Sequence, residues 1–335
     1  MRIKNITVIL LFIILSGCQY FTMMPYREWK EINDKDEVDI YVAGSYNALP
    51  CYWKNGIKTE LEHEGTGYAT SISFNGQNLY IGGGDNGFPC YWKNGKKINL
   101  DHTGNLGATL FSMSVNGGIV FSCGYETIIS TQKACYWINE KQYFLKLPNG
   151  ATGDSRGISI VVDNDTLNFY ISGYYQNGTN YACYWENGGE CITIGTSGSE
   201  AQDIFVSNGK KYILIEQLSN MSYWVDGASY LLQGAPTLLS SIYVYNGDVF
   251  VAGKIGTDVC IWKNQNLNNI LSTNDAINAL YANTISIYND DIYVAGMFNN
   301  IGVNNASYWK NNNLTNLSFS GTTSLAFTIV VKPRR

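Results

Sequence analysis

The sequence predicts an all-β fold made of seven four-stranded antiparallel sheets, and three observations support this. A short motif with a tryptophan occurs seven times along the chain. The copies lie about 43 residues apart, the length of one four-stranded unit in a repeat protein. Most copies also contain Asn-Gly pairs, which favour tight hairpins because both residues tolerate positive φ. Seven such sheets around one axis form a seven-bladed β-propeller.

The tryptophan motif is clearest in the first two copies, where residues 51–56 and 90–95 both read CYWKNG. The spacing between successive tryptophans ranges from 38 residues (Trp224 to Trp262) to 48 residues (Trp137 to Trp185). We expect each of these side chains to be buried between blades, because one blade alone cannot cover its own apolar faces. The seven are Trp53, Trp92, Trp137, Trp185, Trp224, Trp262 and Trp309.

Each repeat divides into four strands, named a to d in chain order. Strand a alternates polar and apolar residues, as in residues 241–245, and an Asn-Gly turn follows it. Strand b is expected to end in glycine, as in residues 250–253 (FVAG), and strand c carries the tryptophan motif. A second turn leads to a short strand d, as in residues 97–100. Alternation places Cys and Trp on one face of strand c, with Tyr and Lys on the other.

The two ends of the repeat array complement each other. The first repeat begins at strand b, residues 38–44, and has no strand a before it. Residues 324–330 follow the last repeat and alternate as a strand a would. We therefore expect the C-terminal segment to complete the first blade, because closure removes exposed sheet edges. The propeller would then span residues 37–331, with residues 332–335 as a basic tail.

The composition agrees with this fold and excludes one class of partner. The chain of 335 residues has 25 Tyr, 8 Trp and 34 Gly, and charged residues make up 15%. Aromatic residues favour strands, and glycine favours turns. The net charge is −5 and the C-terminal tail is the only basic run. Nucleic acid is therefore not expected as a partner, since it requires many phosphate-neutralising cations.

The N-terminus has the features of an export signal. Arg2 and Lys4 precede an apolar segment, residues 6–15, that is too short to span a bilayer comfortably. It ends with Leu15-Ser16-Gly17-Cys18, which resembles the lipobox of bacterial lipoproteins.

The lipobox resemblance implies a signal peptide over residues 1–17 and an acylated Cys18. Residues 18–36 would then form a lipidated tether, and the protein would be anchored to a membrane of the bacterial cell envelope on its extracytoplasmic side. Several acyl chains are needed for stable attachment, and lipoprotein processing supplies them.

Two further resemblances concern the repeat. The order of an alternating strand, an Asn-Gly turn, a strand with a terminal glycine and a strand with tryptophan resembles WD-repeat and kelch-like propellers. The Trp-Asp dipeptide of WD repeats is absent. The consensus YVAG…CYWKNG is also similar to tandem repeats of bacterial lipoproteins. These resemblances imply an architecture and no particular activity.

Five cysteines share one position in strand c of five blades. Equivalent positions on neighbouring blades are too far apart for a disulfide, so we expect small buried side chains. Cys123 and Cys191 lie outside this position, and a disulfide between them is an alternative. The five are Cys51, Cys90, Cys135, Cys183 and Cys260.

Candidate ligand-binding residues lie in the d-to-a and b-to-c connections, which share one end of a propeller, here called the loop face. Variable loops on a regular scaffold often carry binding specificity. His63 and His102 occupy equivalent places in adjacent repeats, with Asp101 beside His102. Common descent of two repeats explains them without a metal, and no metal is predicted. Aromatic side chains suited to sugars or peptides are Tyr46, Phe88, Tyr125, Tyr174, Tyr175 and Phe298.

Catalytic groups are few. Arg156 is the only arginine inside the ring, whereas sialidase-type propellers use an arginine cluster. Four acids expected in d-to-a connections could converge near the axis as glycosidase carboxylates do, although solvated loop acids explain them equally. They are Asp154, Glu200, Asp203 and Asp275.

No catalytic residue and no cofactor are assigned. A non-enzymatic binding module for a glycan, peptide or envelope protein is the expected function. An envelope scaffold and a glycan-active enzyme are the alternatives.

Overall fold

The computed structural model describes residues 37–334 apart from residues 104–106, 164–165, 219, 272–277, 301 and 319–320. The expected signal peptide, Cys18 and the tether lie outside the described residues, as do Asp275 and Arg335. Within the described part, no helix is long and apolar enough to cross a membrane.

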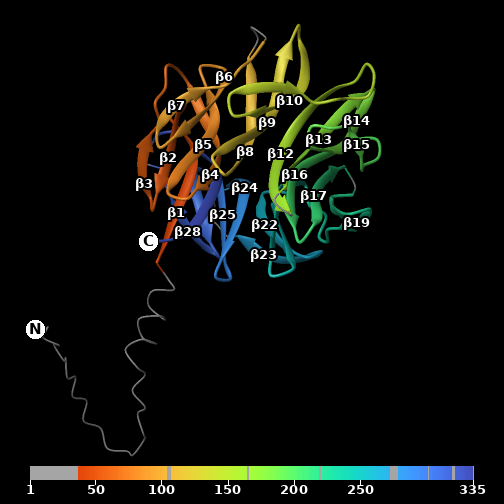
Figure 1. Ribbon diagram of the computed structural model, residues 1–335. Coiled ribbons are helices and arrows are strands. Elements are labelled where there is room, and N and C mark those ends of the chain that lie inside the picture. The colour runs from red at the N-terminus through yellow and green to blue at the C-terminus, as the bar shows by residue number, and fades with distance from the viewer. Residues whose placement is uncertain are drawn as a thin grey trace, which may run out of the picture. The chain divides into compact units, whose positions relative to one another are not determined.

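The described residues form seven four-stranded antiparallel sheets, which confirms the predicted fold class. The sheets surround a common axis (Figure 1), and strand a of every blade faces it. The inner strands, from blade 1 to blade 7, are β28 (Ser324–Pro333), β4 (Gly67–Asn75), β8 (Ala108–Asn116), β12 (Thr152–Asp163), β16 (Ser199–Ser207), β20 (Leu238–Tyr245) and β24 (Asn278–Tyr288).

The other strands follow outward in each blade. Strands b are β1 (Val38–Tyr46), β5 (Asn78–Asp85), β9 (Ile119–Ile128), β13 (Thr166–Asn177), β17 (Lys210–Gln217), β21 (Asp248–Ile255) and β25 (Asp291–Asn300). Strands c are β2 (Leu49–Lys54), β6 (Phe88–Lys93), β10 (Thr131–Ile138), β14 (Thr179–Glu186), β18 (Ser222–Val225), β22 (Asp258–Lys263) and β26 (Val303–Lys310). Strands d are β3 (Ile57–Glu60), β7 (Lys96–Asn99), β11 (Lys141–Phe144), β15 (Ile192–Thr193), β19 (Ala228–Leu231), β23 (Asn266–Leu271) and β27 (Asn313–Asn316).

The C-terminal strand closes the ring as predicted, because β28 pairs antiparallel with β1. It continues to Pro333, so Lys332 and Pro333 belong to the strand rather than to the tail in which the sequence placed them. Arg334 Nε lies 3.2 Å from Asp39 Oδ1 on β1. Partial burial disfavours the Asp39 carboxylate, but hydrogen bonds from Lys54, Asn55 and Arg334 outweigh it and lower its pKa to about 2.

The turn between strands c and d has the same construction in all seven blades. Its first residue is Asn in six blades and Asp226 in the fifth, with φ between 42° and 54°. The side-chain oxygen accepts a hydrogen bond from a backbone N–H of strand b, as Asn94 does from Leu79 N at 2.9 Å. Asn suits this position because it tolerates the left-handed region and supplies the acceptor.

Six of the seven repeat tryptophans are fully buried, as predicted: Trp53, Trp92, Trp137, Trp185, Trp262 and Trp309. Trp224 is only half-buried, so the prediction is wrong there. The preceding blade ends in β15, a strand of two residues, and half-buried Ile194 follows it. The corresponding residue in other blades is a buried leucine, such as Leu61 or Leu145. The preceding blade therefore covers less of the Trp224 side chain.

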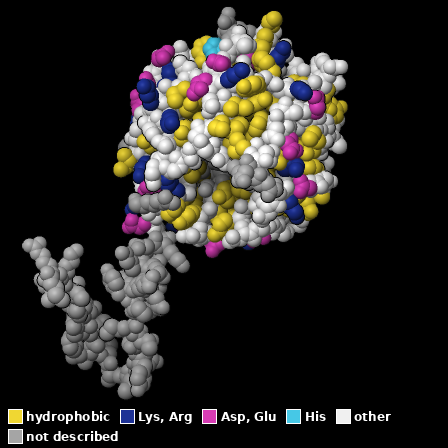
Figure 2. Space-filling model, viewed as in Figure 1, with side chains coloured by type: hydrophobic (Ala, Val, Ile, Leu, Met, Phe, Trp, Pro, Cys, Tyr) yellow, Lys and Arg dark blue, Asp and Glu magenta, His cyan; other side chains and the backbone are white. Residues whose placement is uncertain are grey.

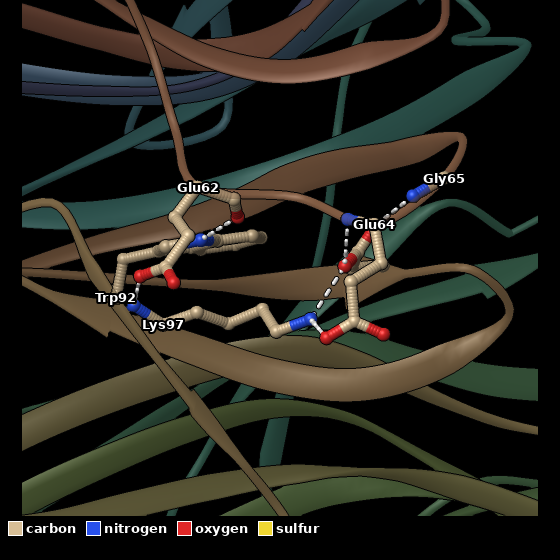
Figure 3. A network of polar contacts seen from close by, with 6 residues as sticks. Glu62, Glu64, Gly65, Trp92 and Lys97 are labelled. Atoms are coloured by element: carbon tan, nitrogen blue, oxygen red, sulfur yellow. Dashed lines mark hydrogen bonds and ion pairs between the residues drawn. The ribbon is translucent and has the colours of Figure 1, made fainter.

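In blades 2, 3, 4 and 6 the indole N–H of the repeat tryptophan also donates to a backbone carbonyl of the connection that enters the blade. Trp92 Nε1 donates to the Glu62 carbonyl at 2.7 Å, and Trp185 Nε1 donates to the Lys146 carbonyl at 2.8 Å. Figure 3 shows the first of these beside Lys97, whose ammonium lies between two carboxylates, 2.8 Å from Glu64 and 2.7 Å from Asp85. Backbone N–H groups of Glu64 and Gly65 also donate to Asp85. The connection is thereby fixed to the blade that follows it.

Candidate functional site: the central cavity and its bulge ring

Every inner strand carries a β-bulge at the same place. In β12, Ser155 pairs with Gly173 and Gly157 pairs with Ser172, which leaves Arg156 as the extra residue. A bulge re-aims a side chain that the regular ladder would direct elsewhere. The seven extra residues, called the bulge ring below, are Phe327, Thr70, Phe111, Arg156, Gln202, Ser240 and Asn283 in the order of blades 1 to 7.

Glycines of strand b make room for these bulges. A Cβ at Gly124 would lie 1.8 Å from the Thr109 carbonyl oxygen, and one at Gly173 would lie 2.1 Å from the Asp154 carbonyl oxygen. The repeated glycine is therefore a point of close backbone approach rather than the end of a strand. The expected strand ends were wrong accordingly, since β9 and β13 continue several residues past these glycines.

The bulge ring forms one end of a cavity of about 1070 Å³ on the propeller axis. All seven bulge residues line it, and its wall continues along the inner strands to Gly76 and Pro333 at their far ends. Figure 2 shows a central hollow with hydrophobic side chains near it and charged side chains mainly toward the margin. The volume suits a ligand of small-molecule size or somewhat larger.

In blades 2, 5 and 7 the side chain of the residue after the bulge is hydrogen-bonded to a neighbouring blade, whose inner strand does not pair directly with its own. Ser71 exchanges hydrogen bonds with the backbone of Met113 at 3.0 and 3.1 Å, and Thr284 Oγ1 accepts one from Ile329 N at 2.9 Å. In blade 5 this position is Asp203. Its carboxylate accepts hydrogen bonds from Ile242 N, Ser241 Oγ and Ile204 N at 2.9–3.0 Å. Burial raises the pKa of Asp203 to about 6, against these donors.

Arg156 is the cationic member of the bulge ring. Its Nε lies 3.1 Å from Asp154 Oδ2, and its guanidinium carbon lies 4.8 Å from the ring centre of Phe111 and 5.7 Å from that of Tyr174. Aromatic faces attract a guanidinium, so three groups hold this one in place. The Arg156 side chain keeps 29% of its surface exposed and forms part of the cavity wall.

A second layer of acids lies behind this wall. Asp154 is 1% exposed, and burial raises its pKa to about 7 although Arg156 opposes the shift. Its Oδ1 has no hydrogen-bond partner in the structure. Gln202 Nε2 donates to Glu216 at 2.8 Å and to Glu200 at 3.3 Å. The acids thus fix the bulge residues of blades 4 and 5 and do not line the cavity.

Three of the four acids expected in d-to-a connections lie in strands instead. Asp154 belongs to β12, and Glu200 and Asp203 belong to β16. Their position near the axis was anticipated, but the inner strands begin earlier in the chain than the alternating pattern indicated. Extra residues in each bulge interrupt the alternation on which the expected boundaries rested.

The two histidines lie in the expected connections, and each contacts a different residue. His63 Nε2 contacts Glu60 Oε1 at 3.1 Å, and the His102 ring stacks on Phe88 with centres 4.5 Å apart. The Asp101 carbonyl accepts the indole N–H of Trp137 at 2.7 Å. Among the described residues, no group of three or more His, Cys, Asp or Glu side chains is placed to hold a metal ion.

None of the other aromatic residues named from the sequence lines the cavity, but two support the bulge ring from behind. Tyr174 packs against Arg156, and Tyr125 lies 5.8 Å from Phe111. The other four lie elsewhere: Lys58 sits 4.2 Å from the Tyr46 ring centre, Tyr175 stacks on Tyr181 at 5.2 Å, Phe88 stacks on His102, and Phe298 is buried. A ligand role for these loop-face residues stays a prediction.

All seven described cysteines are free, including Cys123 and Cys191. The five repeat cysteines are buried, as predicted. Burial raises the pKa of the Cys260 thiol to about 11 and that of Cys51 to about 12. These thiols are therefore protonated at neutral pH and act as small apolar side chains.

Sequence reasoning missed the bulge ring, although the sequence holds a signal for it. Three flanking positions repeat: a small or apolar residue before the bulge, Ser or Thr in five of seven blades after it, and Ile in six of seven blades after that. The bulge position itself carries six different residue types. A glycine inside strand b was the second signal, because it indicates a bulge or a close backbone approach.

Comparison with known proteins supports the architecture only. No family model matches the chain, and no curated protein matches it. Among solved structures, the WD40 β-propeller domain of Doa1 is similar, with a TM-score of 0.53, 16% identity, and coverage of 88% of this chain and 90% of that one.

A puromycin-hydrolyzing peptidase of Mycobacterium tuberculosis is also similar, with a TM-score of 0.52, 10% identity, and coverage of 80% of this chain and 49% of that one. At these identities the likeness extends to the fold alone. The chain is therefore a seven-bladed β-propeller whose fold is similar to that of a WD40 β-propeller domain.

Proposed function

We propose that the protein is a non-enzymatic binding module of the bacterial cell envelope that holds its ligand in the central cavity. The observation that carries the proposal is the bulge ring. One position of an otherwise repetitive strand takes six residue types, and all seven copies of that position line the same cavity. Variation at a position that lines one surface of a regular scaffold is typical of a specificity site.

The fold itself does not require this variation. The residue after the bulge makes contacts between blades, such as those of Ser71 and Asp203, and the isoleucine beyond it fills the core. Thr70 and Asn283 also donate to backbone carbonyls of the next blade, at 3.0 and 2.6 Å. Phe111 and Phe327 have no polar side-chain group for such a bond, and Arg156 pairs with Asp154 of its own strand. These three residues are the strongest candidates for ligand contact.

A binding role fits the acids better than catalysis does. Glycoside hydrolysis commonly uses two carboxylates on either side of the scissile bond. Asp203 is the one carboxylate among the described residues that line the cavity, and its oxygens already accept three hydrogen bonds. The remaining acids near the axis lie behind the wall and hold Arg156 and Gln202.

Filling the central cavity with a tryptophan side chain tests whether the ligand binds there. The full-length chain would be applied to arrays of envelope saccharides and peptides, alongside Ser240→Trp in the bulge ring and Ser229→Trp on the exposed strand β19 as the matched control. We expect Ser240→Trp to lose the signal and Ser229→Trp to keep it, with similar melting temperatures. If Phe88→Ala and Tyr175→Ala abolish binding while Ser240→Trp leaves it intact, the ligand sits on the loop face and the cavity proposal is wrong.

Attachment at Cys18 forms the second part of the proposal and rests on the lipobox resemblance. Cells expressing the chain would be fed a clickable palmitate analogue and separated into membrane and soluble fractions. We expect the protein to carry the label and to stay with the membrane, and Cys18→Ala to lose both properties. An unlabelled wild-type protein in the soluble fraction would refute the anchor and leave the cavity argument untouched.

A further inference from the structure

The charged residues of the cavity wall favour an anionic ligand. Arg156 lies in the bulge ring and Lys332 near the other end, and Asp203 is the one acid among the described wall residues. The Asp203 oxygens are occupied by donors from blades 5 and 6. Two cations thus line the cavity, and the one carboxylate in the described wall already accepts three hydrogen bonds from the protein.

The bulge ring also has two chemically distinct sides. Blades 1 to 3 contribute Phe327, Thr70 and Phe111, which places two aromatic rings on one side. Blades 4 to 7 contribute Arg156, Gln202, Ser240 and Asn283, which are donors and acceptors. An aromatic surface opposite amide and hydroxyl groups suits a sugar ring, whose C–H face is apolar and whose edge carries hydroxyls.

Hydroxyl groups continue this pattern below the bulge ring. The wall includes Ser73, Ser114, Ser159 and Ser286, together with the aromatic residues Phe74 and Phe205. The Lys332 ammonium lies 4.2 Å from the Phe74 ring centre, so the second cation is also placed beside an aromatic face. The same combination of cation, aromatic ring and hydroxyl therefore occurs at both ends of the cavity.

Arg156 is suited to a carboxylate because its position is set before a ligand arrives. Asp154 meets the guanidinium at Nε, and Phe111 and Tyr174 lie against it. A guanidinium carries five N–H donors in a planar fork that matches a carboxylate. A residue that is already ordered loses less entropy on binding than a free side chain would.

We propose that the cavity binds a carboxylate-bearing sugar, with the carboxylate on Arg156 and the sugar ring against Phe111 or Phe327. This rests on the proposed function and specifies the ligand class of the same site. Two sources share the chemistry, namely uronic acids of acidic polysaccharides and the lactyl amino sugar of peptidoglycan.

The test uses calorimetry on the full-length chain with four probes. Glucuronic acid and N-acetylmuramic acid are the acidic probes, and glucose and N-acetylglucosamine are their neutral counterparts. We expect at least one acidic sugar to bind about tenfold or more tightly than its counterpart, the effect of one charge-assisted pair. The acid that binds identifies the source, and the methyl ester of that acid should bind no better than the neutral sugar.

Two variants test whether Arg156 causes the preference for the acidic sugar. Arg156→Gln should reduce the ratio of acid to neutral affinity to about one. Lys97→Gln is the matched control, because Lys97 also pairs with a buried acid, Asp85, but lies outside the cavity wall. It should keep the wild-type ratio. If Arg156→Gln does not fold, the wild-type comparison between the acid and its methyl ester decides instead.

The results distinguish a failure of the carboxylate inference from a failure of the proposed function. Equal affinity for acid, ester and neutral sugar, or an unchanged ratio in Arg156→Gln, overturns the carboxylate inference, as does the absence of binding by both acids. If Ser240→Trp still abolishes binding of a neutral ligand, the proposed function survives without this inference. If Ser240→Trp abolishes nothing that the wild type binds, the proposed function itself fails.

Discussion

Replacement of Trp185 by alanine should strongly lower the stability of the propeller. The indole is 0% exposed and belongs to a core shared by blades 3 and 4, with Phe121 and Tyr136 on one side and Ile158 and Ile171 on the other. Truncation of a buried tryptophan costs about 3–5 kcal/mol. The change also leaves the Lys146 carbonyl without the indole donor at 2.8 Å, which adds about 1 kcal/mol.

The sum of about 4–6 kcal/mol is a large part of the 5–15 kcal/mol that stabilises a typical domain. A domain of this size loses roughly 2 °C of melting temperature per kcal/mol, so the expected decrease is about 10 °C. Differential scanning calorimetry and the near-ultraviolet circular dichroism signal would follow the transition. Trp185→Phe should recover part of the loss, because it restores much of the volume and not the hydrogen bond.

Trp224→Ala is the matched control. Trp224 occupies the same repeat position but is half-buried, with Tyr184 at 5.8 Å between ring centres. Its removal should cost less than that of Trp185, because part of its surface is already exposed and less area is lost from the core. Equal decreases for the two variants would show that burial between blades is not the source of the stability, and the packing argument would fail.

Three further predictions concern other parts of the fold. Asn94→Ala should destabilise by about 1–2 kcal/mol in urea denaturation, since it removes the acceptor for Leu79 N in a left-handed turn, whereas Asn94→Asp should cost less. The pKa of Asp154 is about 7 in the folded protein and 3.8 ordinarily, so the stability that its bound proton contributes is lost as pH rises from about 4 to 7. Asp154→Asn should therefore gain melting temperature relative to wild type across that window, and parallel pH curves would contradict the burial of this carboxyl. Truncation after Thr323 should leave one edge of β1 unpaired and give an aggregating protein, and a synthetic peptide of residues 324–335 should restore the thermal transition if pairing with β1 is the cause.

The regular parts of the blades could be predicted because they depend on local chemistry. Alternation along strand c indicated that Cys51 and Trp53 share a buried face, and the structure confirms it. Turn residues such as Asn94 and Gly95 marked the hairpin between strands c and d, where both have positive φ. Closure by residues 324–330 followed from counting strands at the two ends of the array.

The site was harder to predict because it depends on departures from regularity. A single extra residue in strand a shifts the register, so the face that Arg156 occupies cannot be assigned from alternation. Tyr174 and Tyr125 were noticed as aromatic residues of irregular segments. Only the structure places them behind Arg156 and Phe111. The importance of Asp154 likewise comes from its burial, which sequence does not report.

The sequence by itself determined the number of blades, the order of the four strands within each repeat, and the partner of the C-terminal segment. These depend on periodicity and on turn residues that act over a few positions. Tertiary structure alone decided that seven residues some 40 positions apart meet around one cavity, and which of them are cationic, aromatic or amide on each side. That arrangement arises because every inner strand bulges at the same level of a closed ring, so small local irregularities add up to one shared surface.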